Sequence, residues 1–350
     1  MPNDFVSVTI VTYDSGHFIR RCLESVLAQK FERKEIIVID NNSTDGTADI
    51  LEQFEDRCRI IYNNENLGFS VAQNQAIAMA RGNWVLTLNP DVLLLPDFIQ
   101  SLVDAGNIDS SVGTVCGKLL SIKSSFDLPE KPLVDSTGIY FTPMLRHLDR
   151  GSQQVDNGDY AKNEYVFGAT AAAALYRREM IGDISVQGEF FDSDFFVYRE
   201  DADVAWRAQL LGWKCLYTPR AHAYHVRKVL PGNRRALPAV INMHSVKNRF
   251  LMRVKNITPR LYRQNCLSIT ARDAVVLGCC LVWERSSLQG LMFVVRNWRR
   301  VLAKRREIMS RVRVSEEYMM SWFSYQPVSR PAPQTVIRTP QRQQKAVRGR

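Results

Sequence analysis

The first hundred residues alternate between short apolar strands and helical segments, and this alternation constrains the fold more than any other feature. The apolar, β-branched runs are Val6–Thr12, Glu35–Asp40, Arg59–Tyr62 and Asn83–Leu88. Segments with apolar residues at helical spacing separate them, namely His17–Gln29, Thr47–Phe54 and Ser70–Ala80. Repeated βαβ units form a mostly parallel sheet with helices on both faces. The sequence therefore predicts a Rossmann-like α/β fold.

Polar residues follow these strands directly. They are found in Thr12–Asp14, Asp40–Asp45, Asn63–Gly68 and Asn89–Asp91. Open α/β sheets bind their ligands at the carboxyl ends of the strands. We therefore expect the functional site at that edge.

Carboxylates in two places are typical of metal binding and of proton transfer. Asp91 follows a buried strand, where it could hold Mg²⁺ or Mn²⁺, although a Pro-containing turn would explain it equally simply. Glu200, Asp201 and Asp203 begin the predicted helix at 201–211, where acids also favour a helix N-terminus. The apolar run before them suggests a pocket edge, where partial burial suits a carboxylate to take a proton. His225 follows a later strand and could join Asp91 on a metal, although a lone histidine is more often structural.

Five blocks, in order, resemble family 2 glycosyltransferases of the GT-A fold, especially the bacterial rhamnosyltransferase-like branch. They read VTYDSGHFIRRCLESVLAQ, EIIVIDNNSTDGT, NENLGFSVAQNQAIAMARGNWVLTLNPDV, VFGATAAAALYRREM and FFDSDFFVYREDADVAWRAQLLGWKCLYTPRAHAYHV. The resemblance covers residues 4–230 and implies an inverting, metal-dependent enzyme. Such an enzyme moves a sugar from a nucleotide diphosphate to an acceptor hydroxyl.

The resemblance also implies a role for each matching residue. Asp40 would accept a hydrogen bond from the N3–H of uracil or thymine, with Thr12 and Tyr13 beside it. Asn66, Gly68 and Arg81 would shape the nucleotide loop, Arg81 contacting the pyrophosphate. Asp91 and His225 would hold Mg²⁺ or Mn²⁺, Asn89 would replace the first acid of the Asp-x-Asp motif, and Asp201 would be the general base. Gly168, Glu200 and Asp203 would lie on the acceptor side.

The LNPDV segment favours dTDP-rhamnose as the donor, with a UDP-sugar next, and a glycan or lipid-linked glycan as the acceptor. Two rival functions remain open. A sugar-phosphate nucleotidylyltransferase would need a Gly-rich basic loop after the first strand, where only Gly16 is found. A non-catalytic sugar- or nucleic-acid-binding module is the other, and the combination of Asp91, Asp201 and His225 argues against it.

The charge of the chain is divided unevenly. Residues 1–225 hold 20 Lys and Arg against 31 Asp and Glu, whereas residues 226–350 hold 26 against 5. We expect a catalytic domain at 1–230, basic amphipathic helices at 231–325 and a disordered basic tail at 326–350. Residues 232–325 could bind an anionic membrane, pack on the catalytic domain or form a homo-oligomer interface. We expect no nucleic acid partner, because no recognised motif accompanies the charge.

The remaining features concern location. We expect neither a signal peptide nor a transmembrane helix, since no stretch of about 18 uncharged apolar residues is evident. The seven cysteines include no CxxC pair, which argues against a zinc site and a disulfide framework. Together these features predict a cytoplasmic enzyme on the inner face of the membrane.

Overall fold

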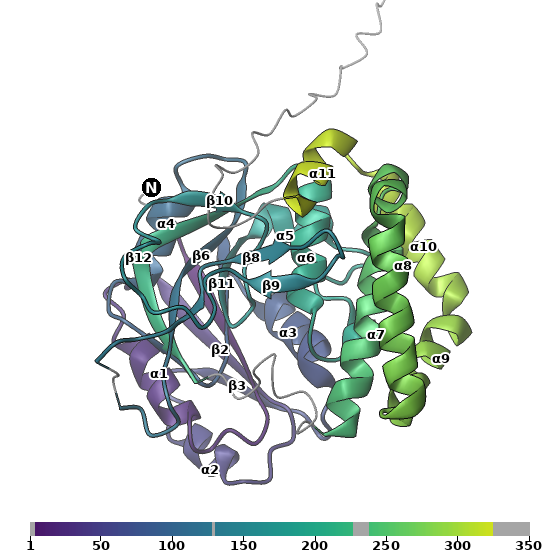
Figure 1. Cartoon of the computed structure of the whole chain (residues 1–350). Helices are drawn as coiled ribbons and strands as arrows, with labels where there is room; N and C mark the ends of the chain where they lie inside the picture. Colours follow the sequence, from purple (N-terminus) through teal and green to yellow (C-terminus); the bar gives the residue numbers. More distant parts are fainter. Residues whose placement is uncertain (1–3, 128–129, 227–237, 325–350) are drawn as a thin grey trace, which may run out of the picture.

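The computed structural model describes residues 4–127, 130–226 and 238–324. Its centre is a ten-stranded sheet with the order β10-β12-β6-β11-β4-β1-β2-β3, in which β5 also pairs with β12 and β7 with β6 (Figure 1). The first strands are β1 (Val6–Thr12), β2 (Lys34–Asp40), β3 (Arg59–Tyr62) and β4 (Trp84–Leu88). All four are mutually parallel where they pair, as predicted.

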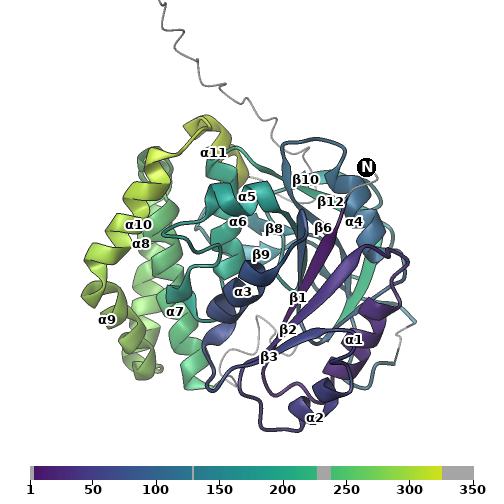
Figure 2. The ribbon, with the colours of Figure 1, turned by 180° about the vertical axis from the view of Figure 1, so that it is seen from behind.

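Helices cover both faces of this parallel half. α1 (Ile19–Leu27) and α4 (Phe98–Gly106) pack on one face, α3 (Gly68–Met79) packs on the other, and α2 (Thr47–Glu52) follows β2 (Figure 2). Every residue of β1 and β4 is buried. Strands covered on both faces are continuous apolar runs, which is why their sequences do not alternate. The predicted α/β fold is confirmed.

The second half of the sheet mixes parallel and antiparallel strands. Its strands are β5 (Val92–Leu94), β6 (Val112–Ser121), β10 (Glu164–Val166), β11 (Ala173–Arg177) and β12 (Lys214–His225). β11 runs antiparallel to both β4 and β6, and β12 runs parallel to β6. The carboxyl end of β12 therefore lies at the same edge of the sheet as the ends of β1, β2 and β4.

The segment 121–159, expected to be partly irregular, adds three short strands. They are β7 (Val134–Ser136), β8 (Ile139–Phe141) and β9 (His147–Asp149). β7 pairs with β6, and β8 pairs with β9. β7 therefore brings a fully buried acid, Asp135, to the functional edge of the sheet.

The C-terminal helices stack against α5 (Arg178–Ile184) and α6 (Glu200–Leu210) on one side of the molecule (Figure 1). They are α7 (Ala239–Asn256), α8 (Pro259–Val282), α9 (Leu288–Arg296), α10 (Trp298–Ser310) and α11 (Glu316–Phe323). α7 contacts α6, α9 and α10. In the described part of the helical region expected at 231–325, several helices turn back on one another.

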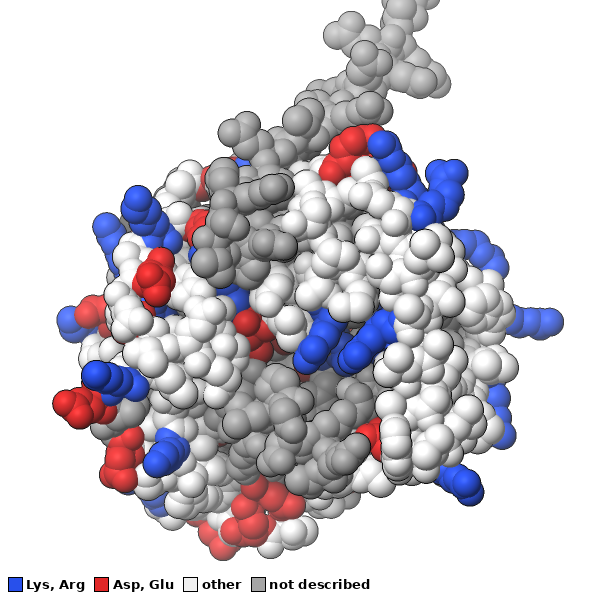
Figure 3. Space-filling model, viewed as in Figure 1, with Lys and Arg blue, Asp and Glu red and all other residues white. Residues whose placement is uncertain are grey.

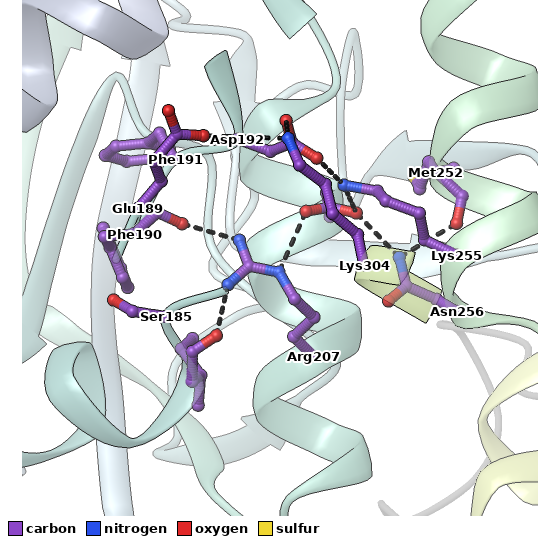
Figure 4. A network of polar contacts seen from close by, with 12 residues as sticks. Ser185, Glu189, Phe190, Phe191, Asp192, Arg207, Met252, Lys255, Asn256 and Lys304 are labelled. Atoms are coloured by element: carbon purple, nitrogen blue, oxygen red, sulfur yellow. Dashed lines mark hydrogen bonds and ion pairs between the residues drawn. The ribbon is translucent and has the colours of Figure 1, made fainter. Parts of the chain in front are cut away.

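A buried cluster of charges joins these helices to the catalytic part of the chain (Figure 4). Lys255 of α7 and Lys304 of α10 are 2% and 3% exposed. Lys304 Nζ lies 2.6 Å from Asp192 Oδ1, and Lys255 is ion-paired with the same carboxylate. Lys255 Nζ also lies 3.0 Å from Asp203 Oδ1, while Arg207 Nε donates to Asp203 Oδ2 at 2.9 Å. Residues beyond 230 therefore supply counter-charges to acids before 230.

This cluster explains part of the basic character of residues 231–325. Residues 232–325 were expected either to bind a membrane, to pack on the catalytic domain or to form an oligomer interface, and three of their cations pack inward. Lys304 and Arg300 pair with Asp194, and Arg305 donates to the carbonyls at the end of α7. The domain boundary near residue 230 stays a prediction. Wherever that boundary lies, α7 and α10 pack against residues that precede it.

We predict that Lys304→Met lowers the free energy of unfolding by about 3 kcal/mol, because it leaves buried carboxylates short of a counter-charge. The cations beside Asp192 outweigh its burial and lower the pKa of that carboxyl below 3.8. A carboxyl whose pKa is lower in the folded than in the unfolded chain stabilises the fold at pH values above the unfolded pKa. This stabilisation is lost as the pH falls toward the folded pKa. Urea unfolding at pH 7 should therefore show the defect, and it should shrink below about pH 4.

Arg306→Met is the matched control, because Arg306 lies on the same helix and is exposed. Its effect should stay within about 0.5 kcal/mol. Equal effects of the two substitutions at pH 7 would contradict a structural role for the cluster.

Candidate active site

The ends of β1 and β2 place the residues predicted for the base of the nucleotide side by side. Thr12 pairs with Asp40 in the register of the two strands. Asp40 is buried, and its carboxylate accepts hydrogen bonds from Ser43 N at 3.1 Å and Ser43 Oγ at 2.5 Å. Thr12 Oγ1 is buried without a hydrogen-bond partner among the described residues, and Tyr13 is half-exposed next to it. An open hydroxyl, a carboxylate and an aromatic ring suit a planar heterocycle.

Asn41, which the sequence argument did not single out, organises the neighbouring nucleotide loop. Its Nδ2 donates to Asn66 Oδ1 at 2.9 Å and to the Gly68 carbonyl at 3.3 Å. Its Oδ1 accepts from Asn63 Nδ2 and from the backbone N–H of Leu67. The signal was present, because Asn41 follows Asp40 at the strand end. Asn41 therefore ties Asn66 and Gly68 to the end of β2.

Gly68 is needed for a close contact. Its φ is +80°, and a Cβ there would lie 2.5 Å from the ring of Phe196. A larger residue would be strained and would also clash. The nucleotide loop therefore lies directly against the segment that precedes α6.

Arg81 does not lie at this edge. It precedes β4, at the amino ends of the strands, and its side chain is 77% exposed. Its guanidinium pairs with Glu35 at 2.9 Å. The predicted pyrophosphate contact is corrected, because the length of the sheet separates Arg81 from the other candidates.

The predicted metal residues meet at the ends of β4 and β12. Val92 pairs with His225 in the sheet, and Asp91 Oδ1 lies 3.4 Å from His225 Nε2. His225 Nδ1 lies 2.8 Å from Asp135 Oδ2. Burial alone would lower the pKa of His225, but the carboxylates of Asp135 and Asp91 together raise it to about 10. Without a metal the imidazole is therefore protonated at neutral pH, held between two carboxylates.

The donor set fits a divalent cation that a substrate completes. Asp91 Oδ1 is buried and has no hydrogen-bond partner among the described residues, and Nε2 of His225 faces it. Asp135 orients the imidazole from its other side, as second carboxylates commonly do for metal-binding histidines. In the described ranges no group of three or more His, Cys, Asp or Glu could hold a metal by itself. Phosphate oxygens and water would have to supply the remaining ligands.

Asn89 contributes through its backbone. Its N–H donates to the Ala172 carbonyl at 2.9 Å and its carbonyl accepts from Val92 N at 3.2 Å. These bonds fix the turn that presents Asp91.

The predicted base, Asp201, lies in the first turn of α6, after a strained loop. Phe196, Tyr198 and Arg199 have φ values of 63°, 69° and 71°. A non-glycine residue with a positive φ costs on the order of 1–3 kcal/mol, and such backbone strain is often found at functional sites. Burial raises the pKa of Tyr198, and the nearby charges of Glu200 and Asp91 raise it further.

Asn248 of α7 holds the strained loop in place. It is fully buried, and its Nδ2 donates to the carbonyls of Phe195 at 2.9 Å and of Val197 and Tyr198 at 2.8 Å. Arg199 Nε also donates to the Ser245 carbonyl of the same helix at 3.1 Å. Sequence reasoning missed Asn248, because nothing local in α7 reveals which carbonyls it would reach.

The three residues predicted for the acceptor side have different positions. Glu200 is buried beside Asp201, with Oε2 lacking a hydrogen-bond partner among the described residues. Asp203 is completely buried in the charge cluster and cannot meet an acceptor. Gly168 is buried against α6, where a Cβ would lie 2.2 Å from the Cβ of Ala205. The roles of Asp203 and Gly168 are therefore corrected to structural ones.

Comparison with known proteins agrees with this geometry. Residues 7–184, more than half of the 350-residue chain, match the profile described as glycosyl transferase family 2. The chain belongs to this family. The N-acetylglucosaminyl-diphospho-decaprenol L-rhamnosyltransferase of Mycobacterium tuberculosis is 26% identical over 63% of this chain and 76% of that protein. The predicted likeness to the rhamnosyltransferase-like branch is thereby confirmed.

Solved structures confirm the GT-A fold of this glycosyltransferase. GalNAc-T7 with UDP, GalNAc and Mn²⁺ has a TM-score of 0.58 at 14% identity, covering 72% of this chain. This chain spans about half of that one, 48%. S. aureus TarS, residues 1–349, has a TM-score of 0.51 at 16% identity, covering 88% of this chain and 83% of that structure.

We predict that the stability of the Glu200→Gln variant, measured relative to wild type, rises as the pH rises. Burial, with Asp201 next to it, raises the pKa of Glu200 from 4.5 to about 8. A group whose pKa is higher in the folded than in the unfolded chain contributes its full stability at pH values below the unfolded pKa. That contribution is lost as the pH rises through the folded pKa. Urea unfolding from pH 4.5 to 9 should show a growing advantage of the variant. An advantage that is independent of pH would contradict this environment.

We predict that activity needs a divalent cation and that Asp91→Ala and His225→Ala each weaken the Mn²⁺ dependence. Asp135→Asn should lower the apparent Mn²⁺ affinity about 10–100-fold through the orientation of His225. Initial rates across a Mn²⁺ titration measure both effects. Full activity in excess EDTA would contradict the metal site.

Proposed function

We propose that this glycosyltransferase transfers a sugar, with inversion, from a pyrimidine nucleotide diphosphate to a hydroxyl of a glycan or lipid-linked glycan in cell-surface polysaccharide synthesis. One observation carries the proposal. Thr12 and Asp40 lie side by side at the ends of β1 and β2, Asp91 and His225 lie together at the same edge, and the loop before α6, whose first turn carries Asp201, contacts Gly68 of the nucleotide loop. These are the parts needed for a base, a charge-neutralising site and a nucleotide pocket.

The chemistry requires one displacement. Asp201 accepts the proton of the acceptor hydroxyl, which attacks the anomeric carbon from the face opposite the leaving group. A divalent cation at Asp91 and His225 would neutralise the charge on the departing diphosphate. The nucleotide is held at Thr12 and Asp40 while the bond to the sugar breaks. No second catalytic carboxylate is required, because the leaving group is not protonated.

We propose dTDP-rhamnose as the donor, with UDP-sugars as the alternative. Asp40 supports a pyrimidine, since uracil and thymine share an N3–H that a carboxylate can accept. The rhamnose assignment is supported by the Asn89–Asp91 sequence and by the mycobacterial relative, whose name specifies L-rhamnose transfer.

The test is a mass-spectrometric donor screen with wild type and Asp201→Asn. Wild type should release dTDP or UDP in preference to GDP, and its product should carry the new sugar with inverted configuration. Asp201→Asn should lower kcat about 10²–10⁴-fold while nucleotide affinity stays near wild type. A variant that retains more than about half of kcat, against that range, would place the base elsewhere.

The membrane proposal depends on the outer face of the C-terminal helices. Their exposed apolar residues are Leu267, Val275, Leu277, Leu281, Val282 and Trp283 of α8 and its end, with Met292, Val295 and Trp298 of α9 and α10. The surface seen over α8 is largely uncharged, with Lys and Arg at its borders (Figure 3). An apolar face bordered by cations suits the surface of an anionic bilayer.

α8 differs from the expectation that no segment could cross a membrane. By length and composition it qualifies as a membrane-spanning helix, although soluble proteins contain such helices too. Asp273 in its middle pairs with Arg249 at 3.2 Å and with Arg253 of α7. Crossing would break or bury these pairs at great cost. We therefore propose that α8 lies on the inner face of the cytoplasmic membrane, and a homo-oligomer interface is the alternative.

We predict that the full chain sediments with phosphatidylglycerol vesicles and much less with phosphatidylcholine vesicles. Added salt should weaken the binding only in part, because apolar contact remains when charges are screened. Replacing Val282 and Trp283 with Ser should release the protein at moderate salt, while Val240→Ser, another exposed position, should not. If the protein sediments with neither kind of vesicle and forms a concentration-dependent dimer in solution, the exposed apolar face is an oligomer interface instead.

A further inference from the structure

A second hollow lies outside the site described above, between the strained loop and the C-terminal helices. Its volume is about 360 Å³, within the range of small-ligand sites. α7 contributes His244 and Lys247, α9 contributes Gln289 and Phe293, and α10 contributes Arg300. Ser193, Asp194 and Phe196, which precede α6, form the opposite wall, and Met243 of α7 completes the lining.

Lys247 is the feature that requires an explanation. It is 4% exposed, yet its ammonium group makes no hydrogen bond or ion pair with any residue in the described part of the chain. Its Nζ lies 4.8 Å from the centroid of the Phe293 ring. A buried lysine without a counter-ion is costly, and it ordinarily loses its charge or finds an anion.

The neighbouring acids do not supply that anion. Asp192 is paired with Lys255 and Lys304, and Asp194 is paired with Lys304 and Arg300. The charged residues that line the hollow are Lys247, Arg300 and Asp194, and Asp194 is already paired with Arg300, so the lining carries one positive charge in excess. Burial lowers the pKa of Lys247 to about 8, and a bound anion would reverse that shift.

The other walls show what kind of anion fits. His244 stacks on Phe196 with ring centroids 4.8 Å apart and 13° between the planes. Burial and the charge of Lys247 lower the pKa of His244 to about 4, so it is neutral at pH 7. Two cations next to aromatic rings suit a phosphate ester that carries an apolar group, better than a free, fully hydrated ion.

The position of the hollow shows where that ester would come from. α9 lines it with Gln289 and Phe293 and exposes Met292 and Val295 on the proposed membrane face. Phe196, on the opposite wall, touches Gly68 of the nucleotide loop. The hollow thus lies between the membrane face and the catalytic edge.

We propose that Lys247 and Arg300 bind the phosphate or diphosphate group of the lipid-linked acceptor, so that its glycan extends past Phe196 toward Asp201. This inference rests on the proposed function, since it presumes an acceptor on a lipid. It adds a binding site for a prenyl phosphate or diphosphate ester to that function.

The test is isothermal titration of the full chain with farnesyl diphosphate, in EDTA so that no divalent cation holds a diphosphate at Asp91. Lys247→Gln and Arg300→Gln should each weaken binding about tenfold or more, as loss of a charge-assisted hydrogen bond does. Arg306→Gln, an exposed change on α10, should bind like wild type. Gln289→Glu and Gln289→Lys, at the exposed rim, should weaken and tighten binding respectively.

Two controls separate the sources of phosphate and the proposals. Farnesol and inorganic pyrophosphate should both bind more weakly than farnesyl diphosphate, and phosphatidylglycerol vesicle binding should not depend on Lys247. Equal binding of farnesol, or wild-type affinity in both Lys247→Gln and Gln289→Glu, would overturn the site. The titration measures binding and needs no turnover. If farnesyl diphosphate does not bind, the donor screen can still show sugar transfer, and if the donor screen shows no transfer, the titration still tests this binding site.

Discussion

The buried carboxylates of Asp192 and Asp203 require counter-charges, and the arrangement of the catalytic half depends on where these come from. Isolated charges are not stable in a protein interior unless they are paired and hydrogen-bonded. Arg207 comes from α6 itself, whereas Lys255 and Lys304 come from the C-terminal helices. The pairs therefore fix α7 and α10 against α6, and α6 carries Asp201 in its first turn.

The position of α7 has a direct consequence for the active site. Once Lys255 and Asn256 have docked on Asp203, Asn248 lies two turns earlier on the same helix and reaches the carbonyls of the strained loop. The bonds of Asn248 offset the strain of Phe196, Tyr198 and Arg199, and the loop in turn contacts the nucleotide segment at Gly68. Charge burial, loop geometry and catalysis are thus linked through one helix.

Much of this could be predicted from the sequence where a local pattern determines the structure. Strands such as Val6–Thr12 are recognisable because burial on both faces requires continuous apolar residues. The structure places Asp91 beside His225, because both follow strands that end at one edge, while their shared metal stays a prediction. Arg81 was misplaced, since a loop before a strand lies at the opposite edge from a loop after it. Asp135, Asn248 and the partners of Lys304 depend on contacts between distant segments, which no local spacing reveals.

The central claim is that α7 positions the loop before Asp201, the proposed base, and Asn248→Leu tests it most directly. The variant keeps the branched shape of the side chain and removes the donors to Phe195, Val197 and Tyr198. Asn265→Leu is the matched control, because its amide bonds only within α8. Single-turnover rates should fall about 10²-fold in Asn248→Leu, as a small displacement of a catalytic group does, with nucleotide affinity nearly unchanged. A folded Asn248→Leu enzyme that turns over at the rate of the control would contradict the account.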